Sequence, residues 1–127
     1  MKFCLATAIM LCAAPALADV AGTWKTEPGD SGGYLHVDFA PCGGEVCGTI
    51  KSAFDASGAL IPDYEHAGKR IVWAMKPDGA NKWSKGKIWA PDRDKTYSSK
   101  MELSGNALKV SGCVLVICRS QNWTRIK

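Results

Sequence analysis

Short stretches in which apolar and polar residues alternate recur along most of the chain. Alternation with a period of two is typical of a β-strand that buries one face and exposes the other. No segment shows the period of an amphipathic helix over the length of a helix. The pattern predicts strands at residues 22–26, 33–39, 45–53, 70–75, 81–90, 95–103, 107–112 and 116–126.

The residues between these strands support the same division. They are rich in Gly, Pro, Asp and Asn, which favour tight reversals of the chain. The clearest of these clusters are at 28–33, 41–44, 77–79, 91–94 and 104–106. An open sheet would leave two unpaired edges, and closure into a barrel removes both. We therefore expect an all-β fold, a single antiparallel eight-stranded up-and-down barrel.

Alternation also predicts which side chains face the inside of this barrel. The expected inward positions are Leu35, Val37, Phe39, Val46, Gly48, Ile50, Tyr97, Ser99, Met101, Leu103, Leu108, Val110 and Gly112. The positions between them are mostly charged or polar, which predicts a wet outer face. Residues 53–69 are less regular, and we expect a long loop there with room for one helical turn. Long loops in compact domains often bind ligands or partners.

The N-terminus is typical of a signal peptide. A lysine follows Met1, an apolar run covers Phe3–Leu11, and the small residues of Ala16-Leu17-Ala18 precede Asp19. Export machinery and signal peptidase recognise this arrangement. The apolar run is too short to span a bilayer. We expect cleavage after Ala18, a β-barrel domain at 19–127 without a transmembrane segment, and a periplasmic or secreted location.

Four cysteines follow the expected cleavage site, in two pairs with the same spacing. An even number of cysteines in an oxidising compartment favours disulfides over a zinc site. Three pairings are possible. We favour the two local ones, because each pair flanks a predicted turn where facing Cβ atoms come close enough to bridge. The expected disulfides join Cys42 to Cys47 and Cys113 to Cys118.

Charge and motifs exclude several classes of function. The formal net charge is +4, and lysines and aspartates are interspersed rather than clustered, so we expect no nucleic-acid partner. Motifs of serine hydrolases, phosphate-binding loops and dinucleotide sites are missing from the sequence. The histidines, His36 and His66, lack partners at metal-ligand spacing. We therefore expect no catalytic residues, no metal and no cofactor.

Several short segments together resemble a known family. They are Gly22-Thr23-Trp24, Cys42 to Gly48, Trp83, Gly86 to Pro91, Lys95-Thr96-Tyr97, Gly112 to Cys118, and Trp123-Thr124-Arg125. With these segments the chain resembles the secreted bacterial proteins of domain of unknown function 2147. The resemblance implies a lipocalin-like, or calycin, barrel in the envelope of a Gram-negative bacterium. It implies no established activity.

The resemblance also implies how the barrel is closed. Trp24 on the first strand is expected to lie under a guanidinium from the last strand, either Arg119 or Arg125. Such a cation–π contact contributes about 1 kcal/mol. The chain departs from the family pattern in two places. Asp94 stands where a turn glycine is usual, and the loop near residues 60–70 lacks the usual Asn-rich and Gly-flanked pattern.

The leading functional hypothesis is a periplasmic binding protein for a small amphipathic or apolar ligand. Aromatic side chains at a barrel mouth offer flat area with few polar atoms, which suits such a ligand. The expected ligand-binding residues are Tyr34, Trp73, Trp89, Tyr97 and Met101. This hypothesis rests on analogy at the level of the fold.

The alternative is an envelope protein-interaction module, such as a protease inhibitor or an assembly partner. It would use the loop at 55–69 or the apolar turn formed by Val114, Leu115, Val116 and Ile117. Turns are normally polar, so this one either folds back over the barrel end or forms an exposed patch that contacts a membrane or partner. Large inward side chains on every strand would favour this alternative over an internal ligand.

Overall fold

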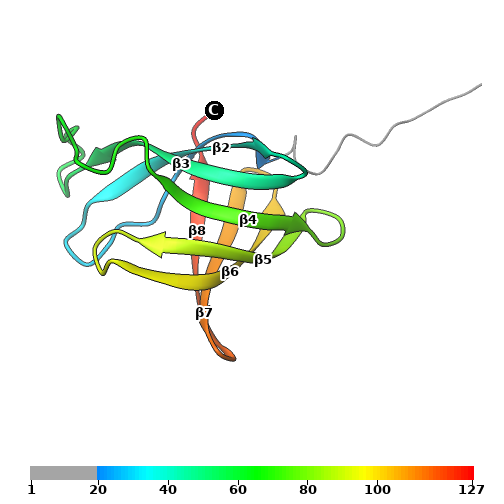
Figure 1. Cartoon of the computed structure of the whole chain (residues 1–127). Helices are drawn as coiled ribbons and strands as arrows, with labels where there is room; N and C mark the ends of the chain where they lie inside the picture. Colours follow the sequence, from blue (N-terminus) through cyan, green and yellow to red (C-terminus); the bar gives the residue numbers. More distant parts are fainter. Residues whose placement is uncertain (1–19) are drawn as a thin grey trace, which may run out of the picture.

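The structure is a computed structural model that describes residues 20–127 (Figure 1). The expected signal peptide, residues 1–18, lies outside the described residues. Eight antiparallel strands form a closed barrel in sequence order, with β1 paired to β8. The strands are β1 (Gly22–Lys25), β2 (Tyr34–Cys42), β3 (Glu45–Phe54), β4 (Arg70–Pro77), β5 (Lys82–Ala90), β6 (Lys95–Ser104), β7 (Ala107–Val114) and β8 (Ile117–Arg125).

The predicted fold class is therefore confirmed. Every predicted strand has a counterpart, and most boundaries differ by two residues or fewer. The largest difference is at β2, which continues through Pro41 to Cys42 because its pairing with β3 extends to the turn. Residues 55–69 form turns and bends, without a helix. The segment is held by backbone bonds, in which Ile50 donates to the Lys69 carbonyl and Gly68 donates to the Ile50 carbonyl.

Large apolar side chains fill the barrel interior. The fully buried ones include Trp24, Trp83, Ile50, Met75 and Leu108. The inward positions expected from alternation are buried or partly buried, among them Val37, Phe39 and Val110. Each of the eight strands contributes at least one side chain to this core or packs one against it. Such filling is the feature expected to favour the protein-interaction alternative over an internal ligand.

Bulges in β4 and β5 change which side chains face inward. Ala74 has φ +59° and Lys85 has φ +59°, a region that side chains other than glycine seldom adopt. The extra residue at each bulge returns Met75 and Gly86 to the interior. There a Cβ on Gly86 would lie 2.4 Å from the Met75 sulfur. Glycine at this position therefore makes room for the methionine.

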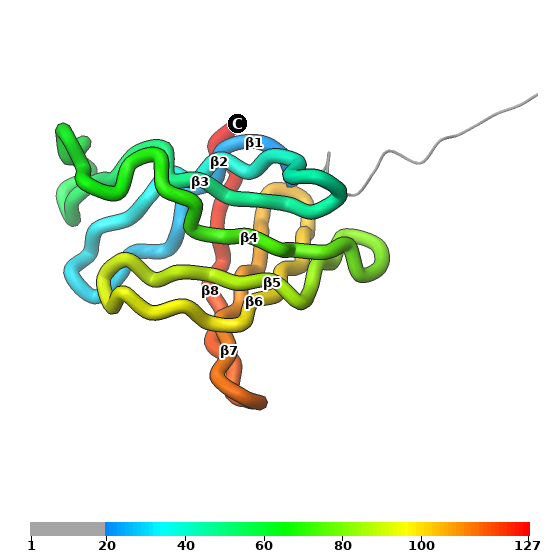
Figure 2. Tube along the Cα trace, in the orientation of Figure 1, coloured from blue at the N-terminus to red at the C-terminus, as the bar shows by residue number. Residues whose placement is uncertain are grey.

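The β7–β8 hairpin projects from the barrel. Its orange end extends beyond the other strands in both views (Figures 1 and 2). The first strand explains this, because β1 pairs with β8 only at Trp24–Arg125 and Lys25–Thr124. The N-terminal half of β8 pairs with β7 in full register down to Val114–Ile117. The hairpin thus forms a two-stranded arm that ends in the apolar turn.

Candidate functional site

The five expected ligand-binding residues do not line one barrel mouth. Met101 lies in the core with 3% of its surface exposed. Tyr97 alternates along β6 with the buried Ser99 and Met101, so Tyr97 also faces inward, and it is half-buried. These two side chains have the orientation that the sequence predicts. The other three do not.

Tyr34, Trp73 and Trp89 lie on the outer face of the barrel. Trp73 follows the inward Val72 and pairs with the exposed Lys87, and successive side chains of a strand point to opposite faces. Trp89 lies two residues after Lys87 on the same face. Tyr34 stacks on Phe54 with ring centroids 5.0 Å apart, under the Lys25 ammonium. The expected shared pocket in the barrel mouth is therefore corrected, because three of the five residues lie on the outer wall.

Trp89 is held in place by its neighbours. Its Nε1 donates to the Asp94 carboxylate at 2.9 Å. The His66 ring meets it edge-on with centroids 5.0 Å apart, and the Lys69 ammonium lies 5.7 Å from its centroid. The loop between β3 and β4 supplies His66 and Lys69. This loop therefore contributes to the outer aromatic surface, a role that its sequence did not predict.

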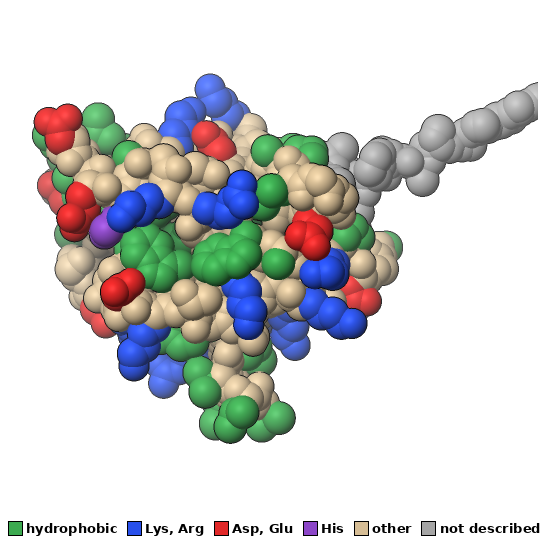
Figure 3. All heavy atoms as spheres, viewed as in Figure 1, with side chains coloured by type: hydrophobic (Ala, Val, Ile, Leu, Met, Phe, Trp, Pro, Cys, Tyr) green, Lys and Arg blue, Asp and Glu red, His purple; other side chains and the backbone are tan. Residues whose placement is uncertain are grey.

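The apolar turn of the β7–β8 hairpin, residues Val114–Ile117, is called the apolar tip below. Its four side chains expose 58%, 94%, 94% and 71% of their surface in chain order. They do not fold back over the barrel end. In Figure 3 the tip stands out as a continuous hydrophobic surface at the bottom of the molecule. Of the two arrangements considered from the sequence, the exposed patch is the one observed.

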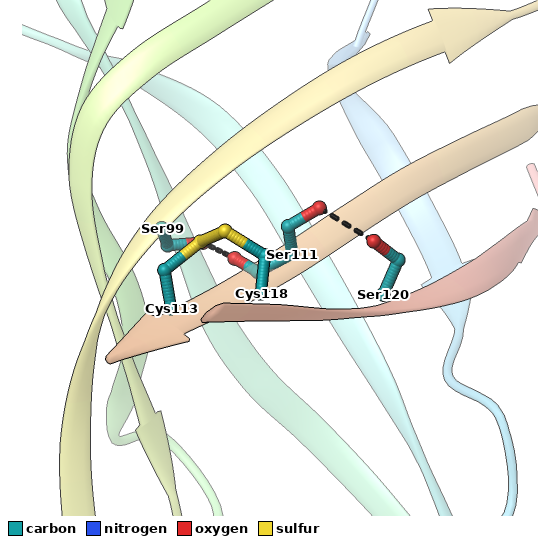
Figure 4. The surroundings of a disulfide bond; sticks show 5 residues. All are labelled: Ser99, Ser111, Cys113, Cys118 and Ser120. Atoms are coloured by element: carbon teal, nitrogen blue, oxygen red, sulfur yellow. Dashed lines mark hydrogen bonds between the residues drawn. A yellow bond between two sulfur atoms is a disulfide. The ribbon is translucent and has the colours of Figure 1, made fainter. Parts of the chain in front are cut away.

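A disulfide and hydrogen bonds hold the base of the tip. The structure contains the Cys42–Cys47 and Cys113–Cys118 disulfides, and Cys113 faces Cys118 across the β7–β8 ladder. Beside it, the Ser111 and Ser120 hydroxyls lie 2.8 Å apart and form a hydrogen bond (Figure 4). The Ser99 hydroxyl donates to the Ser111 carbonyl at 2.6 Å. The hairpin is thus cross-linked where it leaves the barrel.

Two shallow hollows lie on the outer wall of β5, β6 and β7 next to the tip. One has a volume of about 270 Å³ and is lined by Ser84, Lys85, Gly86, Lys87, Ser98, Ser99, Lys100 and Cys113. The other, about 540 Å³, is lined by Lys87, Lys95, Thr96, Tyr97, Ser98, Cys113 and Val114. We call them together the lysine hollow. Its described lining contains lysines and hydroxyls and no carboxylate.

Sequence reasoning did not single out these lysines. The signal was present in the spacing of Lys85, Lys87, Lys95 and Lys100 on neighbouring strands. Such spacing is common on any wet sheet face, so it becomes informative only once the strand register is known. Register places Lys87 opposite Ser98, and Ser98 opposite Cys113. One row of outward side chains therefore connects Trp73 with the base of the tip.

The barrel base is closed by Trp24 and Arg125. The guanidinium carbon of Arg125 lies 4.5 Å from the Trp24 ring centroid. Arg125 also donates to the Ala21 carbonyl at 3.0 Å, and Trp24 Nε1 donates to the Val20 carbonyl at 2.9 Å. Arg119 is exposed and pairs with Gly112 near the tip. Of the two arginines considered for this contact, the structure therefore places Arg125 over Trp24.

One polar atom inside the barrel lacks a partner. Trp83 is 1% exposed, and within residues 20–127 its Nε1 is the buried side-chain nitrogen or oxygen that has no hydrogen-bond acceptor. An unpaired buried donor destabilises the folded state by about 1–3 kcal/mol. This atom is the feature of the interior that would favour an internal ligand.

Local contacts shift the pKa of four titratable groups. A hydrogen bond with the Tyr97 side chain raises the pKa of Arg93. Burial raises the pKa of Tyr64, and burial together with two nearby lysines lowers the pKa of His36. A hydrogen bond from a serine hydroxyl lowers the pKa of Asp55. These shifts have structural causes, and none of the four groups is among the expected ligand-binding residues.

Within residues 20–127 no group of three or more His, Cys, Asp or Glu side chains is placed to hold a metal ion. No helix in that range is long and apolar enough to cross a membrane.

Comparison with known proteins agrees with the architecture. No curated protein matches the chain. Among solved structures, it is similar to one described as "Protein HP1028 from the human pathogen Helicobacter pylori belongs to the lipocalin family". The TM-score is 0.69 at 16% sequence identity, over 85% of this chain and 83% of that one. At this identity the likeness shows the fold, a lipocalin-like barrel.

A bacterial protein family also matches most of the chain. Its description is "Uncharacterized protein conserved in bacteria (DUF2147)", and the match covers residues 22–125. These residues include all eight strands. The chain therefore belongs to the DUF2147 family and has a lipocalin-like fold.

Proposed function

We propose that the protein is an exported binding protein that attaches reversibly to an anionic lipid bilayer through the apolar tip. The observation that carries the proposal is Leu115, which is 94% exposed and has φ +56°. Neither packing nor turn chemistry accounts for a leucine there. A non-glycine residue in the left-handed region costs about 1–3 kcal/mol, and such strain is often retained for function.

Other two-residue turns of the barrel use the residues that such turns favour. Gly43 and Gly44 connect β2 to β3 with φ +58° and +74°. Gly105, with φ +62°, begins the β6–β7 turn at the position that corresponds to Leu115. Glycine adopts these angles without strain. The Leu115-Val116 turn is thus a local exception, which supports a role for its side chains in binding.

The composition of the tip favours lipid over protein as the partner. All four residues are aliphatic, without an aromatic ring or a hydrogen-bonding group in the side chain. Protein-binding hot spots are enriched in Trp, Tyr and Arg, whereas Leu and Val are under-represented. Each aliphatic side chain contributes about 1.5–3 kcal/mol when it is fully buried. A convex apolar tip can enter the acyl region of a bilayer.

Cations next to the tip supply a second attraction. Lys87 and Lys95 line the hollow that Val114 also lines, and Arg119 follows Cys118 on the exposed side of β8. Each lysine or arginine near an anionic surface contributes about 1 kcal/mol. Stable attachment to a bilayer normally needs two signals, such as an apolar group and a basic patch. The tip and the lysine hollow together provide both.

The compartment is part of the proposal. Two disulfides are consistent with an oxidising periplasmic or extracellular environment. The expected signal peptide would deliver the chain there, next to the outer surface of the inner membrane. An assay for cleavage after Ala18, by mass measurement of the secreted chain, tests this part separately.

The test measures binding to vesicles of phosphatidylglycerol and phosphatidylcholine against vesicles of phosphatidylcholine alone. We expect binding to the anionic vesicles that weakens as salt is raised. Leu115→Asn should reduce binding about ten-fold, because most of the buried area of a leucine is lost. The same variant should raise the free energy of unfolding by about 1 kcal/mol, because asparagine tolerates the left-handed region.

Leu60→Asn is the matched control. Leu60 is 58% exposed but lies in the loop between β3 and β4, away from the tip. Its substitution should leave vesicle binding unchanged. No binding to either vesicle, or equal losses for the two leucine variants, would overturn the proposal. The tip is a protein-docking site if neither the unmodified protein nor Leu115→Asn binds vesicles, and if an envelope protein cross-links to the unmodified protein but not to this variant.

A further inference from the structure

We propose that Trp73, Trp89 and the cations around them bind an acidic oligosaccharide. Trp73 and Trp89 are called the aromatic platform. The platform lies at the opposite end, from the apolar tip, of the outward row that runs across β4 to β7, and the two sites share Lys87 of the lysine hollow.

The two tryptophans are neighbours on the outer wall. Trp73 on β4 pairs with Lys87 on β5, so Trp89 is its diagonal neighbour. Diagonal positions place Cβ atoms about 7–8 Å apart, within reach of large aromatic side chains. Figure 3 shows two large hydrophobic groups side by side over β4 and β5, bordered by basic side chains. The two indoles therefore belong to one outer surface that an extended ligand can span.

Trp89 is preorganised for binding. Its indole nitrogen donates to Asp94, and the edge of His66 packs on it. The ring also packs against the buried core cluster of the barrel. A side chain that is already fixed loses little conformational entropy when a ligand arrives.

Asp94 explains how the ring is fixed. It has φ +50° at the end of the β5–β6 turn, a position that glycine would occupy without strain. Aspartate tolerates this region better than most residues, and here its carboxylate accepts from Trp89. The Asp94 carboxylate therefore orients Trp89, which a glycine at this position could not do. In this role Asp94 is a positioning residue.

Lysines lie on two sides of the platform, and the Asp94 carboxylate lies at its edge. The Lys69 ammonium lies 5.7 Å from the Trp89 ring centroid, and Lys87 pairs with Trp73 and lines the lysine hollow. That hollow adds Lys85, Lys100 and the Ser98 hydroxyl, and the residues described around it include no carboxylate. Charge complementarity therefore favours a ligand that carries carboxylate, phosphate or sulfate groups.

The mixture of groups favours a sugar over a nucleic acid. A flat indole face packs against the C–H face of a pyranose, while lysines and serine donate to its oxygens. The formal net charge of +4 is also modest for a nucleic-acid binder.

The test titrates the mature, oxidised protein with oligogalacturonate, a carboxylated sugar chain, and with a neutral maltooligosaccharide, by isothermal calorimetry. We expect binding of the acidic probe that weakens with salt, and much weaker binding of the neutral one. Trp73→Ala should reduce affinity about ten-fold through the lost stacking contact. Lys87→Gln should reduce affinity and lower the dependence on salt.

Asp94 variants separate positioning from folding. Glycine suits the turn conformation at position 94, so Asp94→Gly should leave the melting temperature unchanged. The affinity for oligogalacturonate should fall a few-fold, because Trp89 loses the carboxylate that orients it. Asp94→Asn retains an acceptor and should bind like the unmodified protein. Tyr34→Ala and Lys109→Gln, on other parts of the outer face, serve as aromatic and charge controls.

Several outcomes would overturn the proposal. One is no binding of oligogalacturonate. Another is unchanged affinity in Trp73→Ala and Asp94→Gly. The third is an equal loss of affinity in the two control variants. A single-stranded oligodeoxynucleotide that binds more tightly than the sugar, with the same sensitivity to Trp73→Ala, would assign the platform to nucleic acid instead.

Discussion

Trp24→Ala is expected to lower the free energy of unfolding by about 3–5 kcal/mol, the range for removal of a large aromatic side chain from a core. Trp24 is fully buried and bonds to the Val20 carbonyl, and Arg125 covers its ring. It also lies where β1 and β8 close the barrel through two residue pairs. Loss of the ring would leave a cavity at the weakest point of the sheet. Urea unfolding of the mature, oxidised protein measures the change.

Trp73→Ala is the matched control for this experiment. Trp73 is half-buried on the outer face rather than enclosed in the barrel. Its loss should therefore destabilise the fold much less. A double-mutant cycle of Trp24 with Arg125 should give a coupling of about 1 kcal/mol. Equal effects of the two tryptophan substitutions would contradict the assignment of Trp24 to barrel closure.

Removal of both disulfides is expected to lower the free energy of unfolding by about 4 kcal/mol in the chain-entropy model, about 2 kcal/mol from each short loop. The bridges have equal sequence separation, 5 residues each. Replacing either cysteine pair by serine should thus destabilise the protein by similar amounts. Thermal unfolding of the two double-serine variants, with and without reductant, measures this.

The equal spacing makes each disulfide a control for the other. Cys113 and Cys118 hold the base of the apolar tip, whereas Cys42 and Cys47 flank the Gly43-Gly44 turn. Vesicle binding should therefore weaken when Cys113 and Cys118 are replaced and stay unchanged when Cys42 and Cys47 are replaced. Unaltered stability in both double-serine variants would contradict the structural role of the bridges.

The strands could be predicted because two independent signals coincide. Alternation marks segments such as Leu35, Val37 and Phe39, and the glycine- or proline-rich turns fix where each segment ends. Closure of the barrel followed from the number of strands and the instability of open edges. The local disulfide pairing followed because each cysteine pair flanks a turn. These features depend mainly on residues that lie close together in the sequence.

Alternation with the inward Leu35 already places Tyr34 on the outer face, but the faces of Trp73 and Trp89 could not be predicted in the same way. An aromatic residue in a strand packs on either face, and only register decides which one. The bulges at Ala74 and Lys85 interrupt alternation in β4 and β5, and neither position is a glycine. Composition alone assigned the aromatics to one pocket, whereas three of them lie outside.

The lysine hollow and the role of Asp94 depend on contacts between segments. Lys87 and Ser98 become neighbours only through the β5–β6 register. The bond from Trp89 to Asp94 needs the turn conformation that φ +50° provides. The resemblance drew attention to Asp94 as a departure from the expected turn glycine, but the partner of its carboxylate, Trp89, is known only from the structure. The apolar tip, in contrast, was visible in the sequence as four aliphatic residues in a turn.

The barrel is filled by its own side chains, so we expect binding on its outer surface rather than inside it. Native mass spectrometry of the mature protein, purified from the compartment to which it is exported, distinguishes the two. We expect the bare mass of the folded chain with both disulfides formed. The opposite result is a discrete additional mass that persists in the Trp73 and Leu115 variants but is lost in Trp83→Phe, because such a ligand would lie inside the barrel.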